Sequence, residues 1–240
     1  MTGALWAAVS GIGFGLFQSL NRRAVRDIED PYASTFIQLA IAAVVLVCVT
    51  LAAGEESALA GATAWGVIAF ALAGIVHFLG GWTFLNVSQA RGRRLNLADA
   101  LPGLGAAVMW GTSPVLTVEG LKGIHSPLAG VSIGMLAAVS AYAAALMVRG
   151  TGLGLAALDR DALSFKSAAA VLVALATWLR WVALDHASVG VVLALSLLSV
   201  PVVLFVAPLL VGRHLEHVTA RVWLGSALVV GGALGLIAQG

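Results

Sequence analysis

Residues 165–240 read FKSAAAVLVALATWLRWVALDHASVGVVLALSLLSVPVVLFVAPLLVGRHLEHVTARVWLGSALVVGGALGLIAQG, and this stretch decides the fold class. It contains 26 consecutive uncharged residues from Ala187 to Gly212, and a second uncharged run from Val222 to Gly240. Either run is long enough to cross a hydrocarbon core, which needs about 20 apolar residues. Neither run has the polar face of period 3.6 that a helix on a soluble core would show. The stretch therefore predicts transmembrane helices.

The composition of the whole chain agrees with this interpretation. Of 240 residues, 60% are hydrophobic and 10% are charged, whereas soluble domains carry about 25% charged residues. The composition excludes a separate soluble domain. The single cysteine, Cys48, cannot form an internal disulfide. The uncharged run 1–21 lacks a basic n-region, so we interpret it as a first span and not as a signal peptide.

The alternation of apolar runs and short polar joints predicts an all-α polytopic membrane protein with about eight transmembrane helices. No joint is long enough to form a folded domain. The expected spans are 3–20, 32–53, 64–88, 101–118, 126–148, 167–184, 188–211 and 219–238.

Lys and Arg are distributed unevenly over the joints between these spans. The first, third, fifth and seventh joints hold 11 of the 13 basic residues, and only Lys122 and Arg180 fall elsewhere. The positive-inside rule then places the odd joints in the cytoplasm and both termini outside.

The chain also contains a weak internal repeat. A shift of 99 residues superimposes several residues of the first span on the fourth, and the end of the third span on the end of the sixth; the matched pairs include Leu5 with Leu104, Ala7 with Ala106, Trp82 with Trp181 and Leu85 with Leu184. The units are 1–92 with three spans and 93–240 with five. Because three is odd, the second unit enters the membrane from the opposite side. Such inverted repeats are common in secondary transporters, where the substrate site lies at the repeat interface.

The second unit resembles one repeat of the drug/metabolite transporter superfamily, specifically its EamA-like family. The matching segments are GAAVMWGTSPVL at 105–116 and LDHASVGVV at 184–192; Pro201, Glu216 and the glycines Gly225, Gly231 and Gly232 follow them. The resemblance implies two inverted five-helix repeats that move small metabolites without ATP, in the plasma membrane of a bacterium. It also implies cytoplasmic termini, opposite to the distribution of basic residues, so the orientation stays open here.

The first unit departs from that family pattern. After residues 82–90 it continues directly into RGRRLNLAD, so the fourth and fifth helices of the first repeat are missing. This loss removes half of the wall that would face Val191 to Val211. It favours either a homodimer or a shortened copy that does not transport.

Two ionisable residues inside the predicted spans are candidate substrate-binding residues, because such residues are costly in hydrocarbon. His77 lies near the middle of the third span, where it could bind substrate, carry a proton or bond a backbone carbonyl. Arg180 lies between Trp178 and Trp181 in the sixth span. It could pair with a substrate carboxylate or phosphate, but an arginine beside tryptophans near a helix end is more typical of an interfacial anchor.

A second candidate region is the polar cluster Trp110, Thr112, Ser113 and Pro114 in the fourth span. Proline removes a backbone hydrogen bond, so a freed carbonyl or a hydroxyl there could contact substrate. The first span contributes Gln18 together with closely spaced glycines; these are Gly11, Gly13 and Gly15. Glycine-interrupted helices at corresponding positions indicate a transporter binding site, although close packing without a ligand explains them equally well.

Pro201 and Pro208 predict a kink or gate in the seventh span. Gln38 and Asn86 lie near span ends, where we expect them to contact water. His214 and His217 flank Glu216 in the seventh joint, but two histidines without a third ligand do not define a metal site, so no metal is expected.

The chain lacks the motifs of common hydrolases and a phosphate-binding loop, so neither catalysis nor a cofactor nor nucleic-acid binding is expected. The sequence favours a secondary transporter of a small metabolite, such as an amino acid, in a lipid bilayer. The alternative is a membrane scaffold or partner subunit that does not transport.

Overall fold

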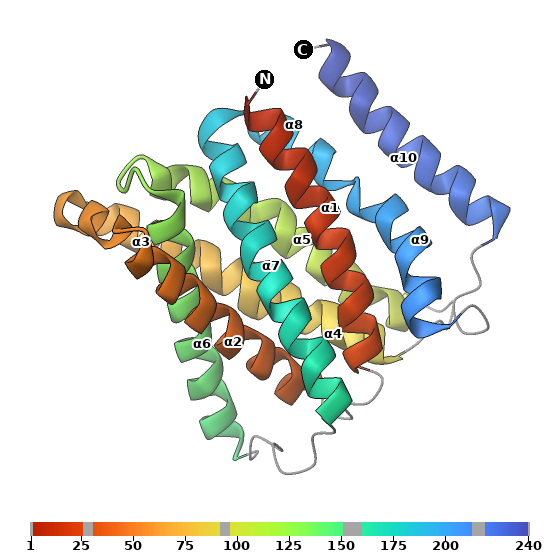
Figure 1. Cartoon of the computed structure of the whole chain (residues 1–240), viewed down its shortest axis with the longest axis horizontal. Coiled ribbons are helices and arrows are strands. Elements are labelled where there is room, and N and C mark those ends of the chain that lie inside the picture. Colours follow the sequence, from red (N-terminus) through yellow and green to blue (C-terminus); the bar gives the residue numbers. More distant parts are fainter. Residues whose placement is uncertain (1, 26–30, 92–96, 151–159, 213–218, 240) are drawn as a thin grey trace.

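The computed structural model describes residues 2–25, 31–91, 97–150, 160–212 and 219–239, and these segments are almost entirely helical, without a strand among them. Figure 1 shows their arrangement. The helices are α1 (Thr2–Val25), α2 (Pro31–Ala52), the 3₁₀-helix η1 (Glu55–Gly61), α3 (Ala64–Gly74), the π-helix η2 (Ile75–Gly81), α4 (Trp82–Arg91), α5 (Leu97–Leu121), α6 (Pro127–Arg149), α7 (Arg160–His186), α8 (Val189–Ser196), α9 (Ser199–Val211) and α10 (Ala220–Gln239).

The prediction of an all-helical, multi-pass membrane protein is confirmed at this level. Seven helical segments among the described residues are long and apolar enough to cross a membrane, and α3, η2 and α4 together form one of them. The eighth predicted span is present as α10, whose described side chains, Ala220–Gly235, form a further apolar segment. The eight predicted spans therefore correspond to these seven long segments and α10.

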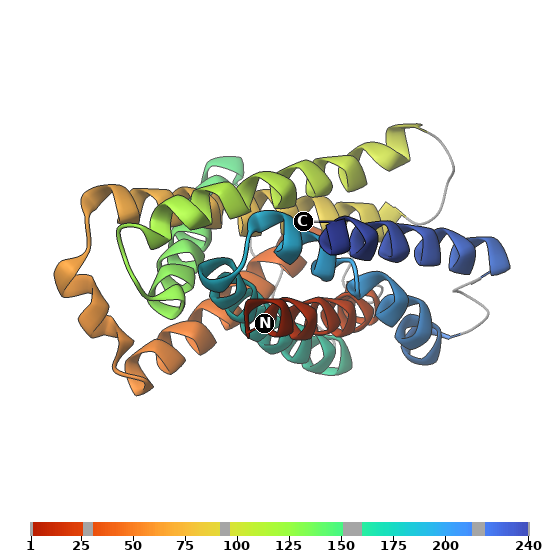
Figure 2. The same ribbon diagram turned by 90° about the horizontal axis from the view of Figure 1, so that it is seen from above.

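The helices pack around α1 and α7, which are the closest-packed pair in the molecule. Helix α1 also contacts α8 and α9, α2 contacts α6 and α7, and α3 contacts α5 and α6. Helix α10 lies at the side of the bundle and packs mainly against α8 and α9 (Figures 1 and 2). The described ends of the chain lie at the same end of the bundle, which fits an even number of crossings.

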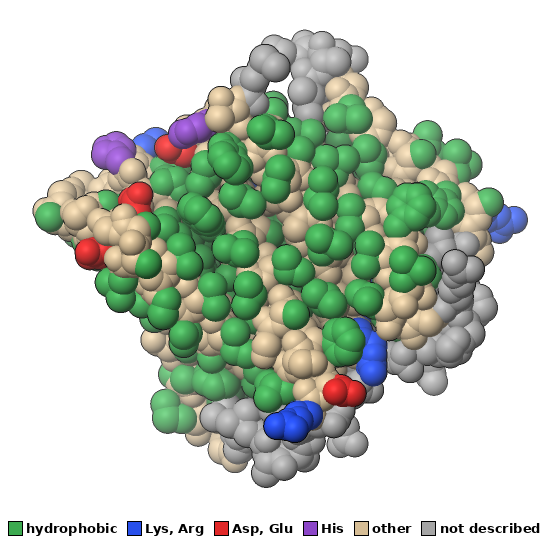
Figure 3. All heavy atoms as spheres, viewed as in Figure 1, with side chains coloured by type: hydrophobic (Ala, Val, Ile, Leu, Met, Phe, Trp, Pro, Cys, Tyr) green, Lys and Arg blue, Asp and Glu red, His purple; other side chains and the backbone are tan. Residues whose placement is uncertain are grey.

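The outer surface is apolar. Figure 3 shows hydrophobic side chains over the middle of one face, with the coloured charged side chains toward its rim. Large apolar residues are exposed on many helices, for example Leu104 at 62% and Leu228 at 68%. A soluble monomer rarely exposes so much continuous apolar area, so this surface is suited to contact with lipid.

Local sequence sets several helix ends. Ser126 precedes α6, where its hydroxyl accepts a hydrogen bond from the Ala129 amide at 3.0 Å and Pro127 occupies the first turn. Thr63 precedes α3 in the same way, and its hydroxyl accepts a hydrogen bond from the Gly66 amide at 3.0 Å. These are the residue types that satisfy the free amides at a helix start.

An aromatic core fills the centre of the bundle between α3, η2, α4 and α7. The rings of Phe70 and Trp181 stack with their centroids 5.2 Å apart, and Phe78 meets Trp82 edge to face at 5.2 Å. All four side chains are at most 1% exposed. This core fixes the position of α7, which carries the functional candidate Arg180.

Candidate functional site

The predicted seventh span is a discontinuous helix. Helix α8 ends at Ser196 and α9 begins at Ser199, and Leu197 and Leu198 form a tight turn between them. Pro201 lies in the first turn of α9 and has no amide hydrogen to give the Leu197 carbonyl, which instead accepts from the Val200 amide at 2.9 Å. The sequence predicted a kink or gate here, and the structure places a full interruption just before Pro201.

The interruption packs directly on the glycines of α1. A Cβ atom on Gly11 would lie 2.6 Å from the Leu195 carbonyl oxygen, and one on Gly15 would lie 2.5 Å from the Cβ of Val202. The absence of side chains lets the α1 backbone approach both halves of the broken helix, as small residues do in lipid. Close packing therefore accounts for Gly11 and Gly15.

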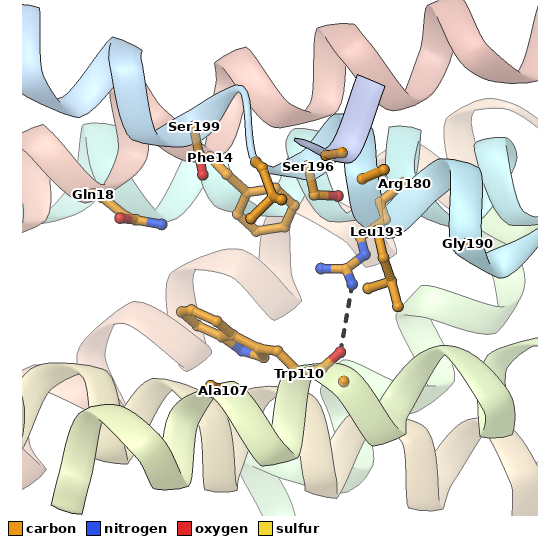
Figure 4. A pocket seen from close by; sticks show the side chains of 13 residues that line it. Phe14, Gln18, Ala107, Trp110, Arg180, Gly190, Leu193, Ser196 and Ser199 are labelled. Carbon is orange, nitrogen blue, oxygen red and sulfur yellow. Dashed lines mark hydrogen bonds between the residues drawn. The ribbon is translucent and has the colours of Figure 1, made fainter. Parts of the chain in front are cut away.

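A cavity of about 510 Å³ lies beside this interruption (Figure 4). Six helices contribute to its walls, and its volume is in the range of small-molecule sites. Three of its lining residues, Ala107, Gly111 and Gly190, are exposed, so the cavity is open to the surroundings of the protein. The lining residues are Phe14, Gln18, Ala107, Trp110, Gly111, Arg180, Gly190, Leu193, Ala194, Ser196, Leu197, Ser199 and Ala233.

Arg180 is the one ionisable residue among those that line the cavity. It is 5% exposed, its Nη2 donates to the Trp110 carbonyl at 3.4 Å, and its guanidinium carbon lies 5.9 Å from the centre of the Phe14 ring. Figure 4 shows the guanidinium reaching across the cavity toward Trp110. Arg180 lies six residues before the end of α7, about 9 Å along the axis at 1.5 Å per residue. The interpretation as an interfacial anchor does not fit this burial.

His77 is fully buried and does not line the cavity. It lies in the π-helix η2, and its Nδ1 is 2.9 Å from the hydroxyl of Ser113. The indole nitrogen of Trp110 donates to the His77 carbonyl at 3.2 Å. His77 and Ser113 therefore stand behind Trp110 and fix the position of this wall residue. The wider turn of a π-helix is often found at functional sites.

Of the remaining predicted site residues, Gln18 lies at the cavity, whereas Thr112, Pro114 and Pro208 do not line it. Gln18 is half-buried and lines the cavity. Thr112 is exposed on the outer side of α5, and its hydroxyl donates to the Val108 carbonyl of its own helix, so we exclude it from the site. Pro114 and Pro208 lie inside α5 and α9 without breaking them, which leaves Pro201 as the proline at the interruption.

A second polar cluster occupies one end of the bundle. The ammonium group of Lys166 on α7 donates to the Asn21 side-chain oxygen on α1 at 2.5 Å and to the Gln38 oxygen on α2 at 2.6 Å. The amide of Asn21 donates to Asn86 at 2.7 Å, and the amide of Asn86 donates to Thr35 at 2.7 Å. All five side chains are at most 1% exposed. The cluster ties α1, α2, α4 and α7 together.

This cluster corrects the expectation that Gln38 and Asn86 contact water, and it contains a lysine that we had placed in a joint. The reason is the length of α7, which begins at Arg160 and so puts Lys166 in its second turn. One signal was present in the sequence. Lys166, Val173 and Arg180 recur every seven residues, which is about two helical turns, so they share one helix face, and that face is the buried one.

The structure identifies no group of three or more potential metal ligands among the described residues. His214, Glu216 and His217 of the seventh joint lie outside those residues.

Comparison with protein-family models, with curated proteins and with solved structures finds no match to this chain.

Proposed function

We propose that the protein is a secondary transmembrane transporter of small metabolites, of the drug/metabolite transporter type that the second unit resembles, in a bacterial plasma membrane. The observation that carries the proposal is the cavity of about 510 Å³ beside the interruption between α8 and α9. Interrupted helices are typical of transporter sites because they expose unpaired backbone groups at membrane depth.

The mechanism would be alternating access between the units 1–92 and 93–240. The cavity is lined by residues of both units, among them Phe14 and Gln18 from the first and Arg180 and Ser199 from the second. A relative movement of the units would therefore change access to the ligand. No nucleotide motif is present in the sequence, so flux would be facilitative or driven by a gradient.

A matched pair of variants on α5 tests this proposal. Ala107 lines the cavity, whereas its neighbour Val108 does not line it and is 55% exposed. In reconstituted vesicles, Ala107→Trp is expected to abolish the flux of a transported metabolite because the indole fills the cavity, and Val108→Trp is expected to retain it. Equal flux through both variants would contradict transport through this cavity.

The second candidate function is a scaffold or partner subunit that does not transport, and one observation favours it. The segment Val189–Val211 has 17% of its membrane window buried, the lowest share of the seven spans. The segment packs on α1, but most of its residues are only half-buried, and such a surface suits an interface with another subunit, including a second copy. Folded wild-type protein that carries no compound across vesicles, with or without a proton gradient, would favour this function.

A further inference from the structure

We propose that the cavity beside the α8–α9 interruption binds a small organic carboxylate that carries one negative charge and an apolar body, and that it discriminates against zwitterionic amino acids and amines. The proposal names the substrate class of the transporter inferred above and so rests on that function, but binding can be tested without transport. From the sequence we expected a small metabolite such as an amino acid, and the proposal replaces this example with a carboxylate that lacks the ammonium group.

The first argument is the incomplete set of partners around Arg180. A guanidinium has five N–H donors and is charged at all physiological pH values. Within the described chain, one acceptor is recorded for it, the Trp110 carbonyl at 3.4 Å, and no carboxylate forms an ion pair with it. A buried charge without a counter-ion is costly. A ligand carboxylate on the cavity side could accept two of the remaining donors in the bidentate geometry that arginine favours.

The second argument is the sign of the charge in the cavity. Its lining contains Arg180 and no Asp, Glu or His. Among the described residues, Glu119 and Asp185 form ion pairs away from the cavity, Glu119 with Lys122 and Asp185 with His186. The ammonium group of an amino acid is one carbon away from its carboxylate, so binding on Arg180 would hold two cations close together with no anion for the second. A monoanion avoids this repulsion.

The third argument is the character of the other walls. Phe14 and Trp110 offer aromatic surfaces near the guanidinium in Figure 4, and Leu193 and Leu197 add aliphatic surface. The polar groups are few, namely Gln18 and two serines at the interruption, and the hydroxyl of Ser196 already donates to the Val192 carbonyl at 2.7 Å. Such a site can make dispersion contacts with the apolar body of a ligand. It has too few polar groups to replace the hydration of a sugar.

The open side of the cavity allows a carboxylate from two sources, a water-soluble metabolite or a membrane lipid such as a fatty acid. The cavity volume of about 510 Å³ suits a small body better than a long acyl chain. We therefore propose a water-soluble carboxylate as the ligand. The test includes a fatty acid, so that binding of a soluble metabolite can be distinguished from binding of a lipid.

The test is calorimetric binding to the purified wild-type protein in a non-ionic detergent, with probes that share one phenylpropyl body. We expect 3-phenylpropionate to bind and 3-phenylpropan-1-ol, 3-phenylpropylamine and phenylalanine to bind about 10- to 100-fold more weakly, the range expected for hydrogen bonds to a charged group. Equal binding of phenylalanine or of the amine would overturn the proposal, as would no binding of any probe. Palmitate that binds while 3-phenylpropionate does not would assign the site to lipid instead.

Variants then locate the anion. Arg180→Gln is expected to remove the preference for 3-phenylpropionate over the alcohol, Arg180→Lys to retain part of it, and Lys122→Gln to leave it unchanged because Lys122 lies on an exposed turn. A preference that survives Arg180→Gln would overturn the role of Arg180. Binding without flux in vesicles would contradict the transporter function and keep the anion site. Flux of phenylalanine in preference to 3-phenylpropionate would contradict the anion site and keep the transporter function.

Discussion

At the scale of single residues, the two buried cations of α7, Lys166 and Arg180, occupy different environments. Lys166 is satisfied by the side-chain oxygens of Asn21 and Gln38, whereas Arg180 faces a cavity with one recorded acceptor in the described chain. A lysine that donates to neutral amides inside a helix bundle serves as a link between helices. An arginine at a cavity wall is available to a ligand. The two residues share one helix face, but their hydrogen-bond partners differ. Helices α1 and α2 provide side-chain oxygens to Lys166, whereas α5 provides one backbone carbonyl to Arg180.

The link made by Lys166 predicts a loss of stability when it is removed. Lys166→Met keeps the length of the side chain but leaves the Asn21 and Gln38 oxygens without their donor, which costs roughly 1–3 kcal/mol for each unsatisfied buried group. We expect a clearly lower unfolding temperature in detergent. Lys122→Met, at an exposed lysine, serves as the control and should unfold like the wild type. An unchanged unfolding temperature for Lys166→Met would show that the cluster does not stabilise the bundle.

At the scale of elements, the contact between α1 and the interrupted helix depends on the absence of side chains. Gly11 faces the backbone carbonyl of Leu195, which cannot rotate away as a side chain can. Glycine inside a helix is less favourable than alanine by roughly 0.5–1 kcal/mol, but at Gly11 the close approach of Leu195 leaves no room for the methyl group of alanine. The turn between the two halves of this helix also borders the cavity, because Ser196, Leu197 and Ser199 line it.

Two identical substitutions should therefore have opposite effects. Gly11→Ala places a methyl group 2.6 Å from the Leu195 oxygen and is expected to destabilise the protein. Gly225→Ala in α10 meets no atom within 4 Å and is expected to stabilise that helix by roughly 0.5–1 kcal/mol. Thermal unfolding of both variants provides the measurement. If Gly11→Ala is tolerated as well as Gly225→Ala, the close approach of α1 to α8 is wrong.

At the scale of the whole molecule, the two ends of the bundle differ in charge. The end opposite the termini carries Arg22, Arg23 and Arg160. The other end carries Glu55 and Glu56 in η1 and Glu119 in the last turn of α5, with Lys122 in the turn that follows; both sets lie among the described residues. Basic residues beside spans favour the cytoplasm. This arrangement favours termini outside the cell and not the cytoplasmic termini implied by the resemblance.

The orientation can be measured with single cysteines in a Cys48→Ser background. Ser57 in η1 and Ser164 near the start of α7 are both exposed and lie at opposite ends of the bundle. We expect an impermeant maleimide to label Ser57→Cys in intact cells, and to label Ser164→Cys only after the membrane is permeabilised. The reverse pattern would place the termini in the cytoplasm.

The sequence by itself determined the class of the protein and the approximate position of its helices. A charge-poor run such as 187–212 cannot remain in water, so hydropathy alone identifies it as a membrane segment. Of the two prolines in the seventh span, Pro201 indicated where it departs from a regular helix and Pro208 did not. Arg180, which was among the sequence candidates, lies at the cavity wall.

The tertiary structure decided which way each polar side chain points. Within lipid, the face of a helix that contacts protein is as apolar as the face that contacts acyl chains, so hydropathy does not distinguish the two. Thr112 and Ser113 are adjacent in the same motif, yet the packing of α5 against η2 exposes the first and buries the second on His77. Lys166 likewise became an internal link because α1 and α2 place their amides beside it. The spacing along α7 indicates the helix face of Lys166, but it does not identify these partners.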